Sequence, residues 1–128
     1  MSNKNLTNLD YATDEALYLS AAYSAGFRYN AMVSQAQRIC ECYMKHAITR
    51  SLMNNNEVMM SHNLRKLYEY MESIGLDLRE IREEVMMLNN FYTHTRYPGR
   101  DAFMATNEDI TSAYMAIQKI TKFMSRYF

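Results

Sequence analysis

Residues 78–92 carry the sequence LREIREEVMMLNNFY, whose apolar side chains recur at the spacing of an α-helix. Successive apolar positions are three, four, three and four residues apart: Leu78, Ile81, Val85, Leu88 and Tyr92. This spacing puts them on one helical face. Tyr97-Pro98-Gly99 follows, and proline both lacks an amide proton and restricts the residue before it. We therefore expect a helix over about residues 78–93 that packs one face against a core.

Four other segments show helical periodicity, over about residues 13–25, 30–52, 61–75 and 106–128. Apolar residues spaced by three and four positions are typical of helices that bury one face. The longest segment has the widest apolar stripe: Met32, Val33, Ala36, Ile39, Cys40, Tyr43, Met44, Ala47 and Ile48. Five helices are therefore expected in all.

Turn and cap residues separate these segments. Gly26 and Gly75 are expected to end two helices, because glycine readily adopts the conformation that follows a helix. Ser61 is expected to cap the helix over about residues 61–75, and Thr106, followed by acidic residues, to cap the last helix. The run Asn54-Asn55-Asn56 predicts a loop, since asparagine favours turns over helix interiors.

Length and composition agree with a helical domain. The chain has 128 residues, with one proline, three glycines and 48% hydrophobic residues. That length allows one domain with a real core, and the scarcity of helix breakers favours helices. The sequence shows no strand-length alternation, internal repeat or interdomain linker. We expect an all-α, single-domain bundle over residues 12–128, preceded by a flexible N-terminal segment over residues 1–11.

Charge and cysteine content exclude several classes of protein. Fourteen basic and fourteen acidic residues give a formal net charge of zero, which argues against a strongly basic nucleic-acid binder but leaves a local basic patch open. Two cysteines cannot form a disulfide framework. Residues 1–10 lack the apolar run of a signal peptide, and no stretch approaches the roughly 18 apolar residues of a membrane span. We expect a cytoplasmic protein with no membrane partner.

The sequence lacks the common cofactor and metal signatures. It contains no GxGxxG, GxxxxGK[ST], HExxH or CxxC pattern. Cys40 and Cys42 are two residues apart, so on a helix they face away from each other. Cys42 and His46 are four apart, but no third ligand is placed near them, and a coincidence of two surface residues is the preferred interpretation. We expect no metal, no cofactor and no catalytic residue of these kinds.

Polar residues interrupt the apolar pattern in the segment over residues 30–52. Gln37, Glu41 and Lys45 are four residues apart on one helical face, and glutamate before lysine is the favourable order for an ion pair. A solvent-exposed ladder of weak pairs is one interpretation. His62 lies in the expected first turn after Ser61, where it is either a capping or packing residue or part of a site.

A second polar group crowds the end of the helix over residues 78–93. Tyr92, His94, Arg96 and Tyr97 lie within a few residues of each other, just before Pro98. Arg96 can satisfy free carbonyl groups at a helix end. An arginine fixed beside aromatic faces is also how proteins hold phosphates and bases, so both interpretations stay open.

Taken in order, these groups resemble the HEPN (higher eukaryotes and prokaryotes nucleotide-binding) domain. The likeness rests on Gln37-x-x-x-Glu41-x-x-x-Lys45, Ser61-His62-Asn63-Leu64-x-x-Leu67, Tyr92-x-x-x-Arg96-Tyr97-Pro98 and a capped final helix. It covers about residues 12–127, and Arg96-Tyr97-Pro98 is its most specific part. It implies a five-helix, up-and-down bundle that commonly forms homodimers and often occurs beside a minimal nucleotidyltransferase. Some members are ribonucleases or toxins.

The catalytic motif of the ribonuclease members is absent from this sequence. Those members carry an Arg-x4–6-His pattern, and none of His46, His62 and His94 has an arginine at the required distance before it. Cleavage of RNA by that motif is therefore not expected, and no catalytic residue is assigned. The resemblance instead implies an anion- or nucleotide-binding site formed by these residues: Arg96, Tyr97, Tyr92, His62, Lys45 and Glu41.

The function expected from sequence is that of a non-catalytic helical protein that binds a nucleotide or RNA, or serves as the accessory subunit of a minimal nucleotidyltransferase in a toxin–antitoxin-like pair. The expected partners are a second copy of the chain, the nucleotidyltransferase and a nucleotide or RNA, but not DNA. One alternative is a ribonuclease toxin with a non-standard histidine. Another is a purely structural interaction module, in which Met59-Met60 and Met86-Met87 adapt to a partner surface.

Overall fold

The computed structural model describes residues 6–96 and 104–128, and side chains over residues 6–91 and 104–128. Within these ranges the chain is all helical. The helices are α1 (Asn8–Ser24), α2 (Ala31–Arg50), α3 (Asn56–Met59), α4 (Leu64–Ser73), α5 (Arg82–Arg96) and α6 (Asn107–Met124), with short 3-10 turns η1 (Arg79–Ile81) and η2 (Ser125–Tyr127). The predicted all-α class is confirmed. The additional helix is the four-residue α3.

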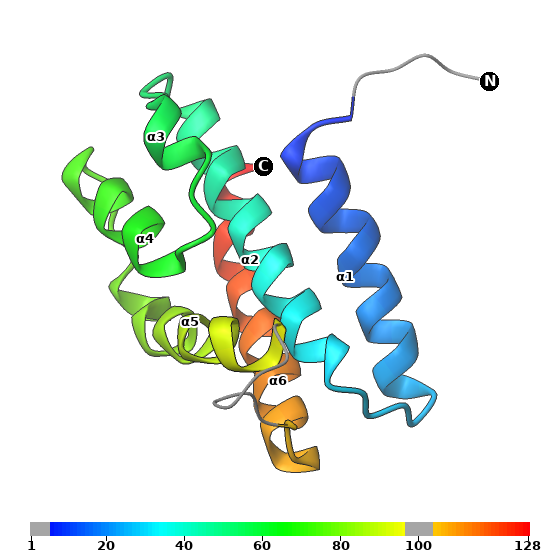
Figure 1. Ribbon diagram of the computed structural model, residues 1–128. Coiled ribbons are helices and arrows are strands. Elements are labelled where there is room, and N and C mark those ends of the chain that lie inside the picture. The colour runs from blue at the N-terminus through cyan, green and yellow to red at the C-terminus, as the bar shows by residue number, and fades with distance from the viewer. Residues whose placement is uncertain (1–5, 97–103) are drawn as a thin grey trace.

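Helix α2 lies at the centre of the bundle (Figure 1). It packs against α1 on one side, α4 and α5 on the other, and α6 behind. The apolar stripe predicted for this helix is entirely buried: Met32, Val33, Ala36, Ile39, Cys40, Tyr43, Met44, Ala47 and Ile48. A helix in contact with neighbours around most of its circumference must also bury residues outside its apolar stripe. This position of α2 determines the environment of its polar residues.

Helix α1 begins earlier than the sequence pattern suggested. It starts at Asn8 rather than near Thr13, because Thr7 and Asp10 form a capping box in which each side chain binds the other residue's backbone amide. Ala12, next to the expected boundary at residues 11 and 12, is fully buried. The boundary expected between residues 11 and 12 therefore falls inside α1.

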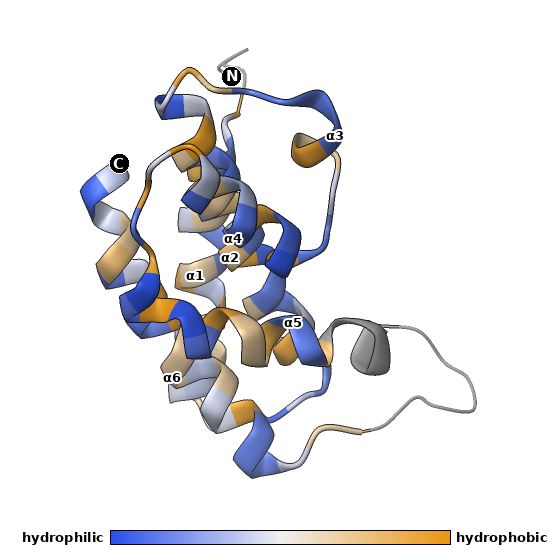
Figure 2. Ribbon diagram, turned by 90° about the vertical axis from the view of Figure 1, so that its left-hand side faces the viewer, coloured by the Kyte–Doolittle hydropathy of each residue, from blue (hydrophilic) through white to orange (hydrophobic). Residues whose placement is uncertain are grey.

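The connection from α2 to α4 differs from the prediction in two details. Asn55 caps α3 through its side chain, so the expected asparagine loop leads directly into a short helix. The cap of α4 is Asn63 rather than Ser61, because the Asn63 side chain accepts from the amides of Arg65 and Lys66. Hydrophilic residues mark the segment that leads into α3 (Figure 2). His62 consequently lies in the connection before α4, and not in its first turn.

The remaining helix ends follow the sequence closely. Gly26 and Gly75 both have positive φ, 91° and 94°, and they follow α1 and α4 as expected. Helix α6 begins after Thr106, which forms the predicted cap as part of a capping box with Asp109. Tyr97-Pro98-Gly99, the expected stop of α5, lies outside the described residues. Over the described ranges, none of the helices combines the length and the apolar character that a membrane crossing requires.

Candidate functional site

A buried polar ladder runs along α2. Gln37, Glu41 and Lys45 are only 2%, 9% and 7% exposed, so the interpretation as a solvent-exposed ladder is wrong. Lys45 Nζ donates to Glu41 Oε2 at 2.9 Å. Removing two charges from water is costly unless they compensate each other, and this pairing is how the bundle accommodates them. Gln37 donates through Nε2 to the carbonyl of Leu88 on α5.

His62 connects this ladder to the surface. Its Nδ1 lies 3.1 Å from each carboxylate oxygen of Glu41. A carboxylate paired with Lys45 can only accept hydrogen bonds, so Nδ1 carries the proton and donates it. The His62 side chain is 60% exposed. The buried ion pair thus fixes the orientation of a surface imidazole, whose Nε2 has no hydrogen-bond partner among the described side chains.

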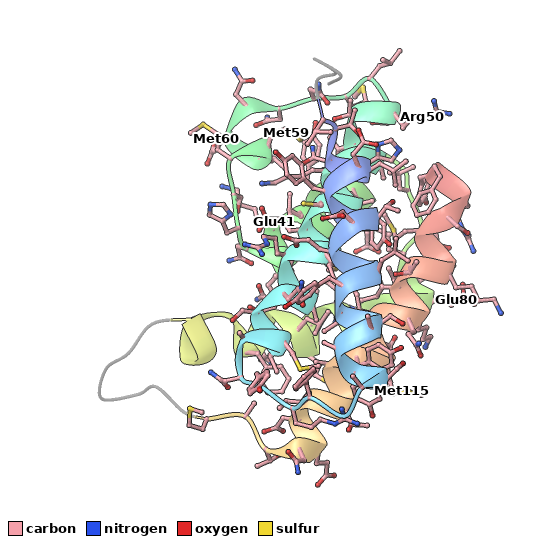
Figure 3. The ribbon with its side chains drawn as sticks, turned by 90° about the vertical axis from the view of Figure 1, so that its right-hand side faces the viewer. Glu41, Arg50, Met59, Met60, Glu80 and Met115 are labelled. Atoms are coloured by element: carbon pink, nitrogen blue, oxygen red, sulfur yellow. The ribbon has the colours of Figure 1, made fainter. Side chains whose placement is uncertain are left out.

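Helices α4 and α5 hold the other side of the ladder. Asn89 of α5 accepts through Oδ1 from the amide of Leu64, the first residue of α4, at 2.9 Å. The adjacent Leu88 carbonyl receives Gln37. These bonds fix α2, the His62 connection and α5 relative to one another. Glu41 lies about halfway along α2, at the level between the α3 region and the end of α5 (Figure 3).

The structure brings together Glu41, Lys45 and His62 from the predicted set. The side chains of Tyr92 and Arg96, and the whole of Tyr97, lie outside the described residues. The helix that carries the first two does have a described course. The C-terminal end of α5 reaches the level of the N-terminal half of α2 (Figure 1), whereas Lys45 lies in the C-terminal half. The described members of the predicted set therefore gather around the middle and the C-terminal half of α2.

The sequence did not single out Arg38, which also lies on this stretch of α2. Its guanidinium forms a two-pronged ion pair with Glu15 of α1, with Nη2 at 2.7 Å and Nε at 2.9 Å from the two carboxylate oxygens. The side chain is 52% exposed. Arg38 is one helical turn from Glu41 and borders a cavity of about 730 Å³ between α1 and the start of α2. In the sequence, the one feature that could have indicated Arg38 is its position within the polar stretch from Gln37 to Lys45.

Two cysteines, Cys40 and Cys42, lie beside the ladder, and their thiols are expected to be unreactive. Burial, reinforced by the neighbouring Glu41 carboxylate, raises the pKa of the Cys42 thiol to about 11. Burial also raises the pKa of the Cys40 thiol. Thiols rather than thiolates are poor nucleophiles and poor metal ligands. Among the described side chains, no group of three or more His, Cys, Asp or Glu residues is placed to hold a metal ion.

Comparison with known proteins gives one finding. The sequence model of the HEPN domain matches residues 8–127, nearly the whole chain. No curated protein and no solved structure gives a significant match. The match begins at the first residue of α1, in agreement with the early start of that helix.

Proposed function

Because the chain belongs to the HEPN domain family, we propose that it is a non-catalytic protein that binds a nucleotide or RNA along α2. The family relates it, at a coarse level, to helical proteins associated with nucleotides and RNA. The observation that carries the finer proposal is the fixed surface imidazole of His62, held by Glu41 in the same stretch of helix that presents Arg38.

Arg38 and His62 both have hydrogen-bonding capacity left for a ligand. A guanidinium has five N–H donors, and Arg38 directs only its Nε and Nη2 groups at Glu15. His62 directs Nδ1 at Glu41 and keeps Nε2 for another contact. In its imidazolium form His62 also donates through Nε2, and charge-assisted hydrogen bonds from an imidazolium and a guanidinium suit the oxygens of a phosphate. Two such groups, one on α2 and one hydrogen-bonded to it, make a candidate phosphate surface.

Glu41 and Lys45 support this surface from within. Lys45 is too deeply buried to be the main contact of a ligand. Its role in the proposal is to hold the Glu41 carboxylate in place, so that Glu41 can orient His62. A side chain held in one rotamer loses less entropy when it binds than a free one does.

Arg96, Tyr92 and Tyr97, which stand in sequence at and just after the end of α5, complete the proposal. The end of α5 lies beside the N-terminal half of α2 (Figure 1), the half that includes Arg38. Arg96 would hold a phosphate there, while Tyr92 or Tyr97 stacks on a base. Replacing Arg96 with alanine should weaken binding by roughly 1.5–3 kcal/mol, the range for hydrogen bonds to charged groups.

The proposal is tested by fluorescence anisotropy with a labelled single-stranded RNA at two salt concentrations. We expect Arg38→Ala, His62→Ala and Arg96→Ala to weaken binding roughly tenfold or more. The matched control is Arg126→Ala, because Arg126 is also about half exposed, at 54%, and pairs with a carboxylate, that of Glu80. Absence of RNA binding by the native chain, or equal affinity in all variants, would contradict the proposal.

The Glu41–His62 pair also favours a second candidate function, cleavage of RNA. A carboxylate-oriented imidazole with a free Nε2 is the arrangement of a general base. His62 would take the proton of a ribose 2′-hydroxyl, the 2′-oxygen would attack the adjacent phosphorus, and the 5′-oxygen would leave as a hydroxyl by taking a proton from water, giving a 2′,3′-cyclic phosphate. Incubation of RNA with the native chain and with His62→Ala separates the two functions, since only the second predicts products that the variant fails to form.

The partners expected from sequence stay predictions. Light scattering tests whether two copies associate, and co-purification with a minimal nucleotidyltransferase tests the accessory role. Neither result changes the assignment of the α2 surface.

A further inference from the structure

A cavity of about 730 Å³ opens between α1 and the N-terminal end of α2. Its walls include three aromatic side chains that remain largely exposed: Tyr18 at 68%, Phe27 at 48% and Tyr29 at 61%. The volume falls within the range of about 300–1,000 Å³ that is usual for small-molecule pockets. Exposed apolar groups that gather at one concave place mark a binding site more often than isolated ones do.

The aromatic wall is held in place before any ligand arrives. The rings of Phe27 and Tyr29 are stacked, with centroids 5.5 Å apart and planes at 20°. Arg28, between them in sequence, donates through Nη1 to the carbonyls of Tyr23 and Phe27 at 2.9 and 2.7 Å. Its guanidinium also lies 3.7 Å from the centre of the Tyr23 ring. The α1–α2 connection therefore presents its rings on a fixed backbone.

The remaining lining supplies hydrogen-bonding groups and one charge. Gln35 and Arg38 of α2 border the same cavity, and so does Asn30, whose Oδ1 already accepts a hydrogen bond from the amide of Ala105. A nucleobase needs both features, because its flat faces stack on aromatic rings and its edges form hydrogen bonds. A purely apolar side chain of a partner protein would use only the first. The Arg38 guanidinium lies at the border, where a base would be attached to its phosphate.

We propose that this cavity binds a nucleobase, stacked on the Tyr18, Phe27 and Tyr29 wall, with the attached phosphate directed to Arg38. This inference rests on the proposed function and adds to it a pocket for the base. Arg38 belongs to both parts, since it lines the cavity and is one helical turn from Glu41. A strand of RNA would then place one base in the cavity and run along α2 towards His62.

The test compares two ligands, a short single-stranded RNA and the same backbone without bases. We expect Tyr18→Ala and Tyr29→Ala to weaken binding of the RNA about fivefold or more and to leave the abasic strand unaffected. Tyr29→Phe keeps the ring and should bind like the native chain. Tyr11→Ala is the matched control, because Tyr11 is an exposed tyrosine of α1, at 52%, that does not line the cavity.

The outcomes separate this inference from the proposed function. If the native chain binds RNA and the cavity variants lose no more affinity than Tyr11→Ala, the nucleobase pocket is refuted while the phosphate surface stands. If RNA does not bind, the proposed function fails. Saturation-transfer NMR with the four ribonucleosides, which lack phosphate, then tests nucleobase binding in the cavity by itself. Nucleoside binding that Tyr29→Ala abolishes would support it, and no nucleoside binding would overturn it.

Discussion

Replacing one residue of the Glu41–Lys45 pair should lower the free energy of unfolding far more than replacing both. Both residues are more than nine-tenths buried, and Lys45 Nζ lies 2.9 Å from Glu41 Oε2. Glu41→Leu leaves the Lys45 ammonium buried without its partner, and Lys45→Met leaves Glu41 with only the hydrogen bond from His62. Each should lower the free energy of unfolding by about 3 kcal/mol or more. The double variant replaces the pair with apolar side chains of similar size and should lie within about 1 kcal/mol of the native chain.

Urea unfolding followed by far-ultraviolet circular dichroism measures these free energies for the native chain, both single variants and the double variant. The expected coupling between the two sites is at least about 5 kcal/mol, because two single losses of about 3 kcal/mol each would add to about 6, whereas the double variant should lose about 1 or less. His62 does not obscure the result, since its side chain is 60% exposed and water can replace Glu41 there. Losses that simply add in the double variant would refute the argument that this is a buried, mutually dependent pair.

Three further outcomes follow from the structure. Leu52 has a positive φ of 61° and is 88% exposed, so Leu52→Gly should stabilise the chain by about 1 kcal/mol in thermal unfolding, and a loss of stability would contradict the strained backbone. Hydrogen bonds from Arg79 hold the pKa of Asp77 at about 2, below its ordinary 3.8, so its stabilising contribution is complete above that ordinary value and lost as the pH falls towards 2. Asp77→Asn should flatten that part of the curve of unfolding free energy against pH, and an unchanged curve would contradict it. Burial and Glu41 raise the pKa of Cys42 to about 11, so a thiol reagent should react with the folded chain much more slowly at neutral pH than with the chain in urea.

The apolar periodicity was sufficient to predict most helices and their core faces. All nine stripe positions predicted for α2 are buried. Apolar residues three and four positions apart fall on one face of a helix, so this spacing indicates the buried face directly. The early start of α1 also had a sequence signal, the Thr7-x-x-Asp10 capping box. The asparagine run did not predict α3, because asparagine favours both turns and helix caps. Only the structure shows that Asn55 is a cap.

The site was less accessible to sequence reasoning. Spacing placed Glu41 and Lys45 on one face of a helix, but whether that face meets solvent depends on how α4 and α5 pack against α2. The contact between Glu41 and His62 joins residues 21 positions apart through a connection without periodicity. The aromatic wall at Phe27 and Tyr29 depends on the turn between two helices, which no local pattern specifies. Local propensity therefore predicts the elements better than it predicts the surface they form.

The most direct test of ligand binding on the α2 surface is an NMR titration of the native chain with a short single-stranded RNA. Amide shifts should gather in the stretch of α2 from Ser34 to Lys45 and in the connection around His62, because these backbone segments carry the proposed phosphate contacts. Shifts confined to the far side of α6, or no shifts at all, would contradict the assignment of this surface.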